Sequence, residues 1–337
     1  MLALRLALRV LRLSLLLSLL LAGLALTLGQ HSNAPMLAFF EAEDGLYLMD
    51  IFSGGHGLIN PDEGLLGHTL SWWPDGQSLL IQQDDLSYLR LSADGRRREA
   101  LFLPVNAHEV RPAQRDQTFA YLAPPANGVD EVWLQIEGEQ HNLSRTPTAW
   151  ESRPTFSPDG RWLAWLSHQS DAGYRLMAYN LESQTRHKLL DSPNYVDGPN
   201  WASDGRLLAL ESNLTTWAEA LIWEELLNTP ERVRIPTHLT LSEVVWSPQA
   251  DKMAHARPIN GLFSVWLYDL HTGREKRLTP EGVIESFPAW SPDGRWLVLW
   301  RQDVRRSSRL VLWDMQGMSQ RSLPVVHGRQ GVAWWRP

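Results

Sequence analysis

Cysteine is absent from the 337-residue chain. Disulfides, thiolate metal sites and thiol nucleophiles are therefore excluded, and the composition indicates neither an oxidising nor a reducing compartment. The chain also lacks an excess of basic residues, because 31 Lys and Arg stand against 38 Asp and Glu. Outside the first 29 residues the basic side chains do not gather into one strip. We therefore expect no nucleic-acid partner.

Recognisable catalytic motifs are missing as well. The sequence contains neither a G-x-S-x-G nucleophile elbow nor an H-E-x-x-H zinc motif. The acidic stretches at residues 41–45 and 84–85 lack the spacing of a calcium loop, and the glycine-rich stretch at residues 53–57 opens no helix. We therefore expect no catalytic residue, no metal and no cofactor, and we expect that the protein is not an enzyme.

The first 29 residues differ in composition from the rest of the chain. Three arginines precede an uncharged apolar run at residues 13–28. A basic flank before an apolar run is typical of export, with the basic end left in the cytoplasm. The pattern predicts a hydrophobic helix at residues 1–29, retained as a single-pass membrane anchor or cleaved as a signal peptide, and a linker at residues 30–35. In both cases residues 36–337 are expected on the periplasmic or extracellular side.

Tryptophan is unusually frequent, with 17 residues, and it belongs to a repeat. The stretch TFSPDGRWLAWL at residues 155–166 returns as AWSPDGRWLVLW at residues 289–300. From Phe156 onward, an aromatic residue of this series recurs every 44 or 45 residues. The gap between Trp72 and Phe156 is nearly two periods, which indicates a degenerate copy with Val110 at the aromatic position. The aromatic members are Trp72, Phe156, Trp201, Trp246, Trp290 and Trp334.

Each copy predicts four short strands. An apolar strand enters a Pro-Asp-Gly turn, in which Pro presets φ, Asp caps locally and Gly accepts positive φ, and three strands follow. Four strands at this period are typical of a β-propeller blade. The sequence therefore predicts an all-β propeller over residues 36–337, most simply with seven blades, while six and eight stay open. The N-terminal strands and the last strand together complete one blade, and the aromatic residues are expected as structural anchors between blades.

The WSPDG repeats resemble the WD40-like PD40 repeat of TolB-type propellers over residues 36–337. The resemblance implies the propeller fold. It implies no single function, because this repeat serves in many unrelated proteins. The separate N-terminal domain of TolB has no counterpart in this sequence, so the chain is not expected to be TolB itself.

Polar residues stand four positions before each aromatic residue of the repeat. In a propeller this position opens the innermost strand, so the side chains are expected to ring one mouth of the central channel and to contact a ligand or peptide. An alternative stays open, in which strands begin with polar residues because they leave a solvated loop. The residues of this ring are His68, Asn106, Ser152, Asp197, Ser242, Ser286 and Gln330. Charged residues one position earlier add ionisable groups, namely Glu151, Glu285 and Arg329.

The sequence favours a membrane-tethered, extracytoplasmic propeller that acts as a non-enzymatic protein-interaction or assembly subunit of a membrane or envelope complex. Two alternatives stay open. One is a propeller enzyme of the lyase or lactonase type that uses the channel mouth. The other is a protein that binds a cell-wall glycan or a small ligand through exposed aromatic residues such as Trp150 and Tyr195.

Overall fold

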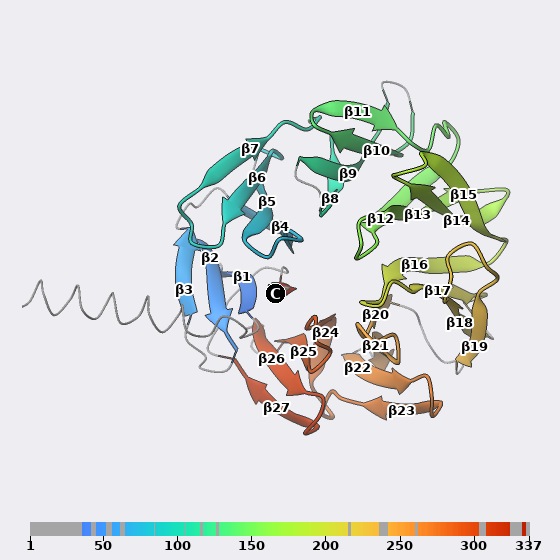
Figure 1. The fold of residues 1–337 in the computed structure, drawn as a ribbon. Helices are drawn as coiled ribbons and strands as arrows, with labels where there is room; N and C mark the ends of the chain where they lie inside the picture. Colours follow the sequence, from blue (N-terminus) through green and yellow to red (C-terminus); the bar gives the residue numbers. More distant parts are fainter. Residues whose placement is uncertain are drawn as a thin grey trace, which may run out of the picture.

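The structure is a computed structural model that describes most of the chain after the first 35 residues. The described residues are 36–41, 45–51, 56–60, 65–83, 85–104, 106–114, 117–125, 128–214, 217–235, 242–259, 262–302, 308–323 and 332–334. They form seven four-stranded sheets arranged like blades around a central axis (Figure 1). The predicted seven-bladed, all-β propeller is confirmed.

The predicted helix at residues 1–29 lies outside the described residues. Within the part of the chain that the structure describes, no helix is long and apolar enough to cross a membrane.

The blades follow one another along the chain, and all but the first are built from consecutive strands. Blade 1 contains β28 (Val332–Trp334), β1 (Met36–Glu41), β2 (Gly45–Asp50) and β3 (His56–Asn60). Blade 2 contains β4 (Leu65–Trp72), β5 (Ser78–Gln83), β6 (Tyr88–Ser92) and β7 (Arg98–Leu101). Blade 3 contains β8 (His108–Pro112), β9 (Thr118–Ala123), β10 (Glu131–Ile136) and β11 (Glu139–Asn142).

The remaining four blades have the same order of strands. Blade 4 contains β12 (Trp150–Phe156), β13 (Trp162–Gln169), β14 (Gly173–Asn180) and β15 (Thr185–Ser192). Blade 5 contains β16 (Tyr195–Trp201), β17 (Leu207–Ser212), β18 (Ala218–Trp223) and β19 (Glu231–Ile235). Blade 6 contains β20 (Ser242–Trp246), β21 (Lys252–Ile259), β22 (Leu262–Asp269) and β23 (Arg274–Arg277). Blade 7 contains β24 (Ile284–Trp290), β25 (Trp296–Gln302), β26 (Ser308–Asp314) and β27 (Ser319–Ser322).

The two ends of the propeller meet in blade 1. The last strand, β28, lies antiparallel to β1, with Leu37 opposite Trp334 and Ala38 opposite Ala333. The predicted closure by the N- and C-terminal strands is therefore confirmed. Because β28 fills the innermost place of blade 1, β1 does not present an unpaired edge.

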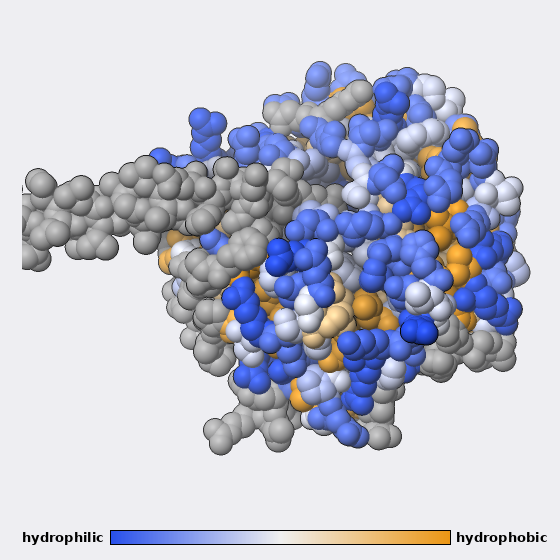
Figure 2. Space-filling view, turned by 60° about the horizontal axis from the view of Figure 1, so that its bottom comes forward, coloured by the Kyte–Doolittle hydropathy of each residue, from blue (hydrophilic) through white to orange (hydrophobic). Residues whose placement is uncertain are grey.

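The apolar core lies in the seams between neighbouring blades. In one cluster, Leu208 and Ile222 of blade 5 pack with Trp246 and Met253 of blade 6. On the surface shown in Figure 2, hydrophilic side chains predominate and hydrophobic residues are exposed in separate patches. Burial of apolar side chains between blades therefore stabilises the ring at each seam.

Three anchor tryptophans also hydrogen-bond across a seam. The indole N–H of Trp201, Trp290 and Trp334 donates in each case to a main-chain carbonyl of the preceding blade, at 3.2, 3.3 and 3.0 Å. The accepting residue always stands directly before the anchor of that blade. These anchors therefore both pack against the neighbouring sheet and hydrogen-bond to its main chain.

The degenerate third copy has a different register from the one predicted. Pro112 pairs with Phe119 across the first turn of blade 3, as Phe156 pairs with Leu163 in blade 4. Pro112 therefore occupies the anchor position, and Val110, the predicted anchor, lies two residues earlier. The reason is that this copy has lost both its anchor aromatic residue and its Asp-Gly pair, so the sequence offers no fixed point for the alignment.

Candidate binding site

The strand connections define two faces of the propeller. The turn face carries the hairpin turns between the first and second strands of each blade. The opposite face, named the mouth face here, is where the first strands begin and the second strands end, as shown by Trp150 of β12, which pairs with His168 of β13.

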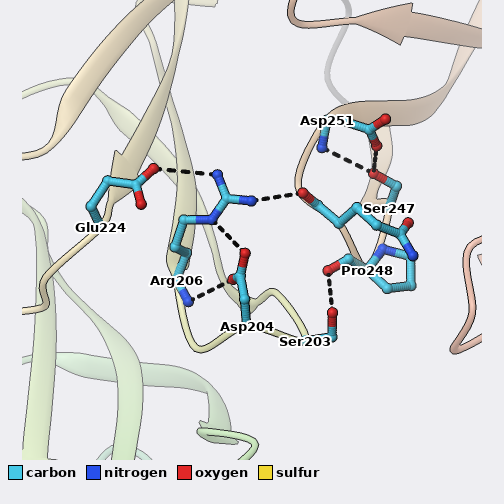
Figure 3. Close-up of polar contacts among 8 residues, drawn as sticks. Ser203, Asp204, Arg206, Glu224, Ser247, Pro248 and Asp251 are labelled. Atoms are coloured by element: carbon cyan, nitrogen blue, oxygen red, sulfur yellow. Dashed lines mark hydrogen bonds and ion pairs between the residues drawn. The ribbon is translucent and has the colours of Figure 1, made fainter.

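Side chains on the turn face are engaged in contacts between blades. Arg206 of blade 5 donates to its own Asp204 at 2.8 Å and to the main-chain carbonyl of Gln249 in blade 6 at 2.7 Å (Figure 3). The Ser203 hydroxyl donates to the carbonyl of Pro248 at 3.0 Å. The recurrent turn aspartates therefore have structural partners, which agrees with the prediction that they hold the turn.

A β-bulge interrupts the pairing of the first and second strands close to the mouth face in blades 2 to 7. In four blades the residue three positions before the anchor has a positive φ there. These residues are Glu109 (47°), Arg153 (56°), Gly198 (119°) and Phe287 (52°). Residues with a Cβ seldom adopt this backbone region, and bulges commonly redirect side chains next to functional sites. The bulge position is therefore a candidate for ligand contact.

Arg153 links three consecutive blades through this position. Its backbone N–H donates to the carboxylate of Glu109 at 2.9 Å, and its guanidinium forms an ion pair with Asp197. The side chain of Arg153 is 50% exposed, whereas that of Asp197 is 6% exposed. Burial raises the pKa of Asp197, and the charge of Arg153 opposes this rise. Because a guanidinium has five N–H donors, Arg153 keeps donors for a ligand.

Three residues of the predicted ring have described positions beside or within the bulges of their strands. Asp197 belongs to the Arg153 contact, and Ser152 and Ser286 lie beside the bulges of β12 and β24. Asn106 does not lie at the equivalent position, because the anchor of blade 3 is Pro112 and not Val110. Asn106 is exposed in the loop before β8.

His108 occupies the ring position of blade 3. Its Nε2 lies 3.1 Å from Oδ2 of Asp130. Sequence reasoning missed it because of the two-residue error in register. For four predicted residues the structure describes no side chain, namely His68, Ser242, Gln330 and Arg329.

Glu151 and Glu285 are buried and do not line an exposed ring. Oε1 of Glu151 accepts hydrogen bonds from the hydroxyl of Ser167 at 3.1 Å and from that of Thr146. Burial raises the pKa of Glu151 to about 7, although these hydroxyls lower it in part. The carboxylate of Glu285 accepts a hydrogen bond from Nε of Arg301 at 2.7 Å.

Arg153 and Glu109 could not be found by the repeat pattern. The four residues with positive φ at the bulge are of four different types, so this column of the repeat shows no common chemistry. Their contact depends on a bulge that the strand pattern does not indicate. Among the described residues, no group of three or more potential metal ligands is present.

Comparison with known proteins identifies the repeat. A family profile described as the TolB beta propeller domain, PD40, matches residues 113–337. The predicted resemblance to TolB-type propellers is therefore confirmed. TolB from Acinetobacter baumannii has the same fold, with a TM-score of 0.52 and 14% identity over 90% of this chain and 83% of that structure.

Two other similar proteins are named as enzymes. The uncharacterized peptidase YuxL of Bacillus subtilis (strain 168) is 30% identical over 145 residues, which are 43% of this chain and 21% of the peptidase. The chain thus spans about a fifth of the length of this relative. A solved oligogalacturonate lyase in complex with manganese has a TM-score of 0.62 and 12% identity, over 86% of this chain and 84% of the lyase.

These similarities correct the expectation that the protein is not an enzyme. A peptidase shares its sequence in part, and a lyase shares its fold. The prediction relied on the absence of catalytic sequence motifs. Such motifs detect only functional residues that are close together in the sequence. At the mouth of a propeller, the side chains come from strands of different blades.

Proposed function

Because the chain belongs to the TolB β-propeller domain family, we propose that its mouth face binds a segment of a protein partner. The observation that carries this proposal is the half-exposed Arg153, held between Glu109 and Asp197 at the bulge of β12. Arginine is enriched among the residues that dominate protein interfaces. Its planar fork suits a carboxylate or two main-chain carbonyls of a bound segment.

We also propose that residues 1–29 hold the propeller at the outer side of a cytoplasmic membrane, as an assembly or accessory subunit of a membrane or envelope complex. Residues 30–35 span at most about 20 Å when fully extended. β1 is the second strand of its blade and therefore begins at the turn face. In this arrangement the turn face is close to the membrane and the mouth face points toward the partner.

Capture of partners from gently solubilised native membranes tests the proposal. The informative variant is the double substitution Arg153→Asn and Asp197→Asn. Asn tolerates the positive φ at position 153, and the second change avoids a buried, unpaired aspartate. The matched control is Arg161→Asn with Glu182→Gln, which removes an exposed pair with a 3.7 Å contact on the turn face.

We expect the wild type and the control to capture the same protein in equal yield. The Arg153/Asp197 variant should capture at least about tenfold less of it, which corresponds to a loss of about 1.4 kcal/mol of binding free energy. Equal yield from this variant contradicts the role of the mouth face. If the wild type captures no protein, the proposal fails altogether.

Catalysis at the mouth face is the second candidate function, and the partial sequence similarity to a peptidase favours it. A buried carboxyl group with a pKa of about 7 has the proton affinity that a general base needs near neutral pH. The test is incubation of the chain with casein peptides and with oligogalacturonate, with and without Mn²⁺, followed by mass spectrometry. Turnover that is lost in Glu151→Gln supports this candidate, and the absence of turnover removes it.

A further inference from the structure

Aromatic side chains form a row at the mouth-face end of blade 4. Trp150 of β12, His168 of β13 and Tyr174 of β14 are cross-strand neighbours and therefore lie on the same side of the sheet. The ring centroids of Trp150 and His168 are 6.1 Å apart with planes 24° from parallel, and those of His168 and Tyr174 are 4.3 Å apart. Tyr174 meets Tyr195 of blade 5 edge-on at 5.4 Å. The row thus reaches the seam between blades 4 and 5.

Trp150 presents its ring to solvent at the start of this row. Its side chain is 49% exposed, whereas the anchors Trp246 and Trp334 are each 8% exposed. Among the described tryptophans, Trp150 alone is an exposed large hydrophobic residue. His168 supports the indole from one side through the stack. The result is a flat apolar ring held in place by its neighbours.

A polar network lies at the same end of the seam. The hydroxyl of Ser192, the last residue of β15, donates to the buried carboxylate of Glu211. Arg232 donates to Glu211 at 2.6 Å and to Glu219 at 3.1 Å. Ser192 is also the cross-strand neighbour of Tyr174, so the network begins where the aromatic row ends. Burial alone raises the pKa of Glu211, but its hydrogen bonds from Ser192 and Arg232 lower it overall.

We propose that this end of the seam between blades 4 and 5 binds a neutral glycan. A sugar ring stacks with its C–H face on the indole of Trp150, because the face of an aromatic ring carries partial negative charge. Hydroxyls of sugars further along the glycan pair with Arg232 and Glu219, which supply donors and acceptors in fixed planes at the other end of the aromatic row. The residues that contact the sugar in this proposal, Trp150, Arg232 and Glu219, include neither Arg153 nor Asp197, so the inference does not rest on the proposed protein partner.

The charges and the exposed area favour this occupant over others. The network contains two carboxylates and one guanidinium, which disfavours an acidic sugar. A protein partner of ordinary size buries about 800 Å² on each side. Of the four rings in the row, Trp150 alone is more than a third exposed. Such a narrow aromatic surface suits a single chain of sugars.

Calorimetric titration of the full chain with chitohexaose and with cellohexaose tests the proposal. We expect the wild type to bind at least one of the two, and Trp150→Ala to weaken binding by about tenfold or more, because the sugar loses the ring on which it stacks. The matched control is Phe102→Ala, which removes another aromatic side chain. Phe102 follows β7 of blade 2, and its side chain is 88% exposed. Arg232→Lys keeps a charge beside Glu211 but loses the planar fork, so it also weakens binding.

Three outcomes overturn the inference. They are no binding of either oligosaccharide by the wild type, equal binding by Trp150→Ala, and binding of oligogalacturonate or a peptide in place of the neutral sugars. The double variant at Arg153 and Asp197 should bind the glycan normally, and Trp150→Ala should capture the protein partner normally. Failure of one site is therefore distinguishable from failure of the other.

Discussion

At the residue scale, the buried carboxyl group of Glu151 makes stability depend on pH. Its pKa rises from 4.5 to about 7 on folding because burial disfavours the charged form. A raised carboxyl pKa gives stability that is fully present below pH 4.5 and is lost as the pH rises through 7. Deprotonation of Glu151 therefore destabilises the folded protein within the pH range in which most proteins are most stable.

We predict that Glu151→Gln removes this dependence. The amide stays neutral at every pH, so its free energy of unfolding relative to the wild type should rise by on the order of 3 kcal/mol between pH 5 and pH 8. Urea unfolding of both proteins at the two pH values measures this difference. A difference that is the same at pH 5 and pH 8 contradicts the protonation of Glu151 in the folded protein.

Residues of the candidate site could be predicted only in copies of the repeat that keep their conserved residues. The position of Asp197 followed from its distance to the anchor Trp201, because that turn keeps its Asp-Gly pair. Asn106 was misplaced and His108 missed because the corresponding turn does not. Arg153 was missed for a different reason, since its role depends on a backbone bulge and on a partner 44 residues away.

At the scale of the element, the first strand of blades 2 to 7 combines an anchor with a bulge. The anchor fixes the strand against the preceding blade, and the bulge turns a residue toward the mouth. Trp290 of β24 is a typical anchor, with its indole N–H bonded to the carbonyl of Val245 at 3.3 Å. Blade 4 has Phe156 at this place, so the hydrogen bond is not required in every seam.

We predict different costs for two substitutions of Trp290. Trp290→Phe loses the hydrogen bond and should lower the free energy of unfolding by about 1 kcal/mol. Trp290→Ala also leaves a cavity and should lower it by about 3 kcal/mol. Urea unfolding measures both, with Phe102→Ala, at a side chain that is 88% exposed, as the control expected within about 0.5 kcal/mol of the wild type. Equal stability of Trp290→Ala and the wild type contradicts the anchor role.

The strands themselves could be predicted because the turn residues and the alternation of apolar residues within each copy agree with the spacing of the copies along the chain. The Asp-Gly turns and the alternating strands at residues 155–166 and 289–300 specify the hairpins β12–β13 and β24–β25 directly. Blade 3, which lacks both the anchor aromatic residue and the Asp-Gly turn, shows the limit of this prediction. Its strands β8 and β9 form without the turn motif, held by seam packing of Val110 and Tyr121 against Trp73 and Leu80 of blade 2. Such tertiary packing leaves no local signal in the sequence.

At the scale of the whole molecule, the ring depends on one junction between distant parts of the chain. β28 supplies the innermost strand of blade 1, and the other three strands come from the beginning of the propeller. Without this strand, β1 would present its edge and blade 7 would lose the indole of Trp334, which donates to the carbonyl of Ala289. Closure of the ring therefore also holds the mouth face, where both proposed sites lie, in one shape.

A disulfide between the two ends tests the closed ring. The chain has no cysteine of its own, so Ala38→Cys with Ala333→Cys introduces a single pair of thiols. The two residues are opposite each other in an antiparallel ladder, at about 4.5–5.5 Å between Cα atoms, which is within reach of a disulfide. The control pair is Ala38→Cys with Ala202→Cys, which places the second thiol in blade 5.

We predict that mild oxidation cross-links the Ala38/Ala333 pair within one molecule, and that the oxidised protein unfolds at a higher urea concentration than the reduced one, because the disulfide constrains the unfolded chain. The control pair should stay reduced or link only between molecules. Free thiols at positions 38 and 333 after oxidation, or links between molecules only, would contradict a ring closed by its own two ends.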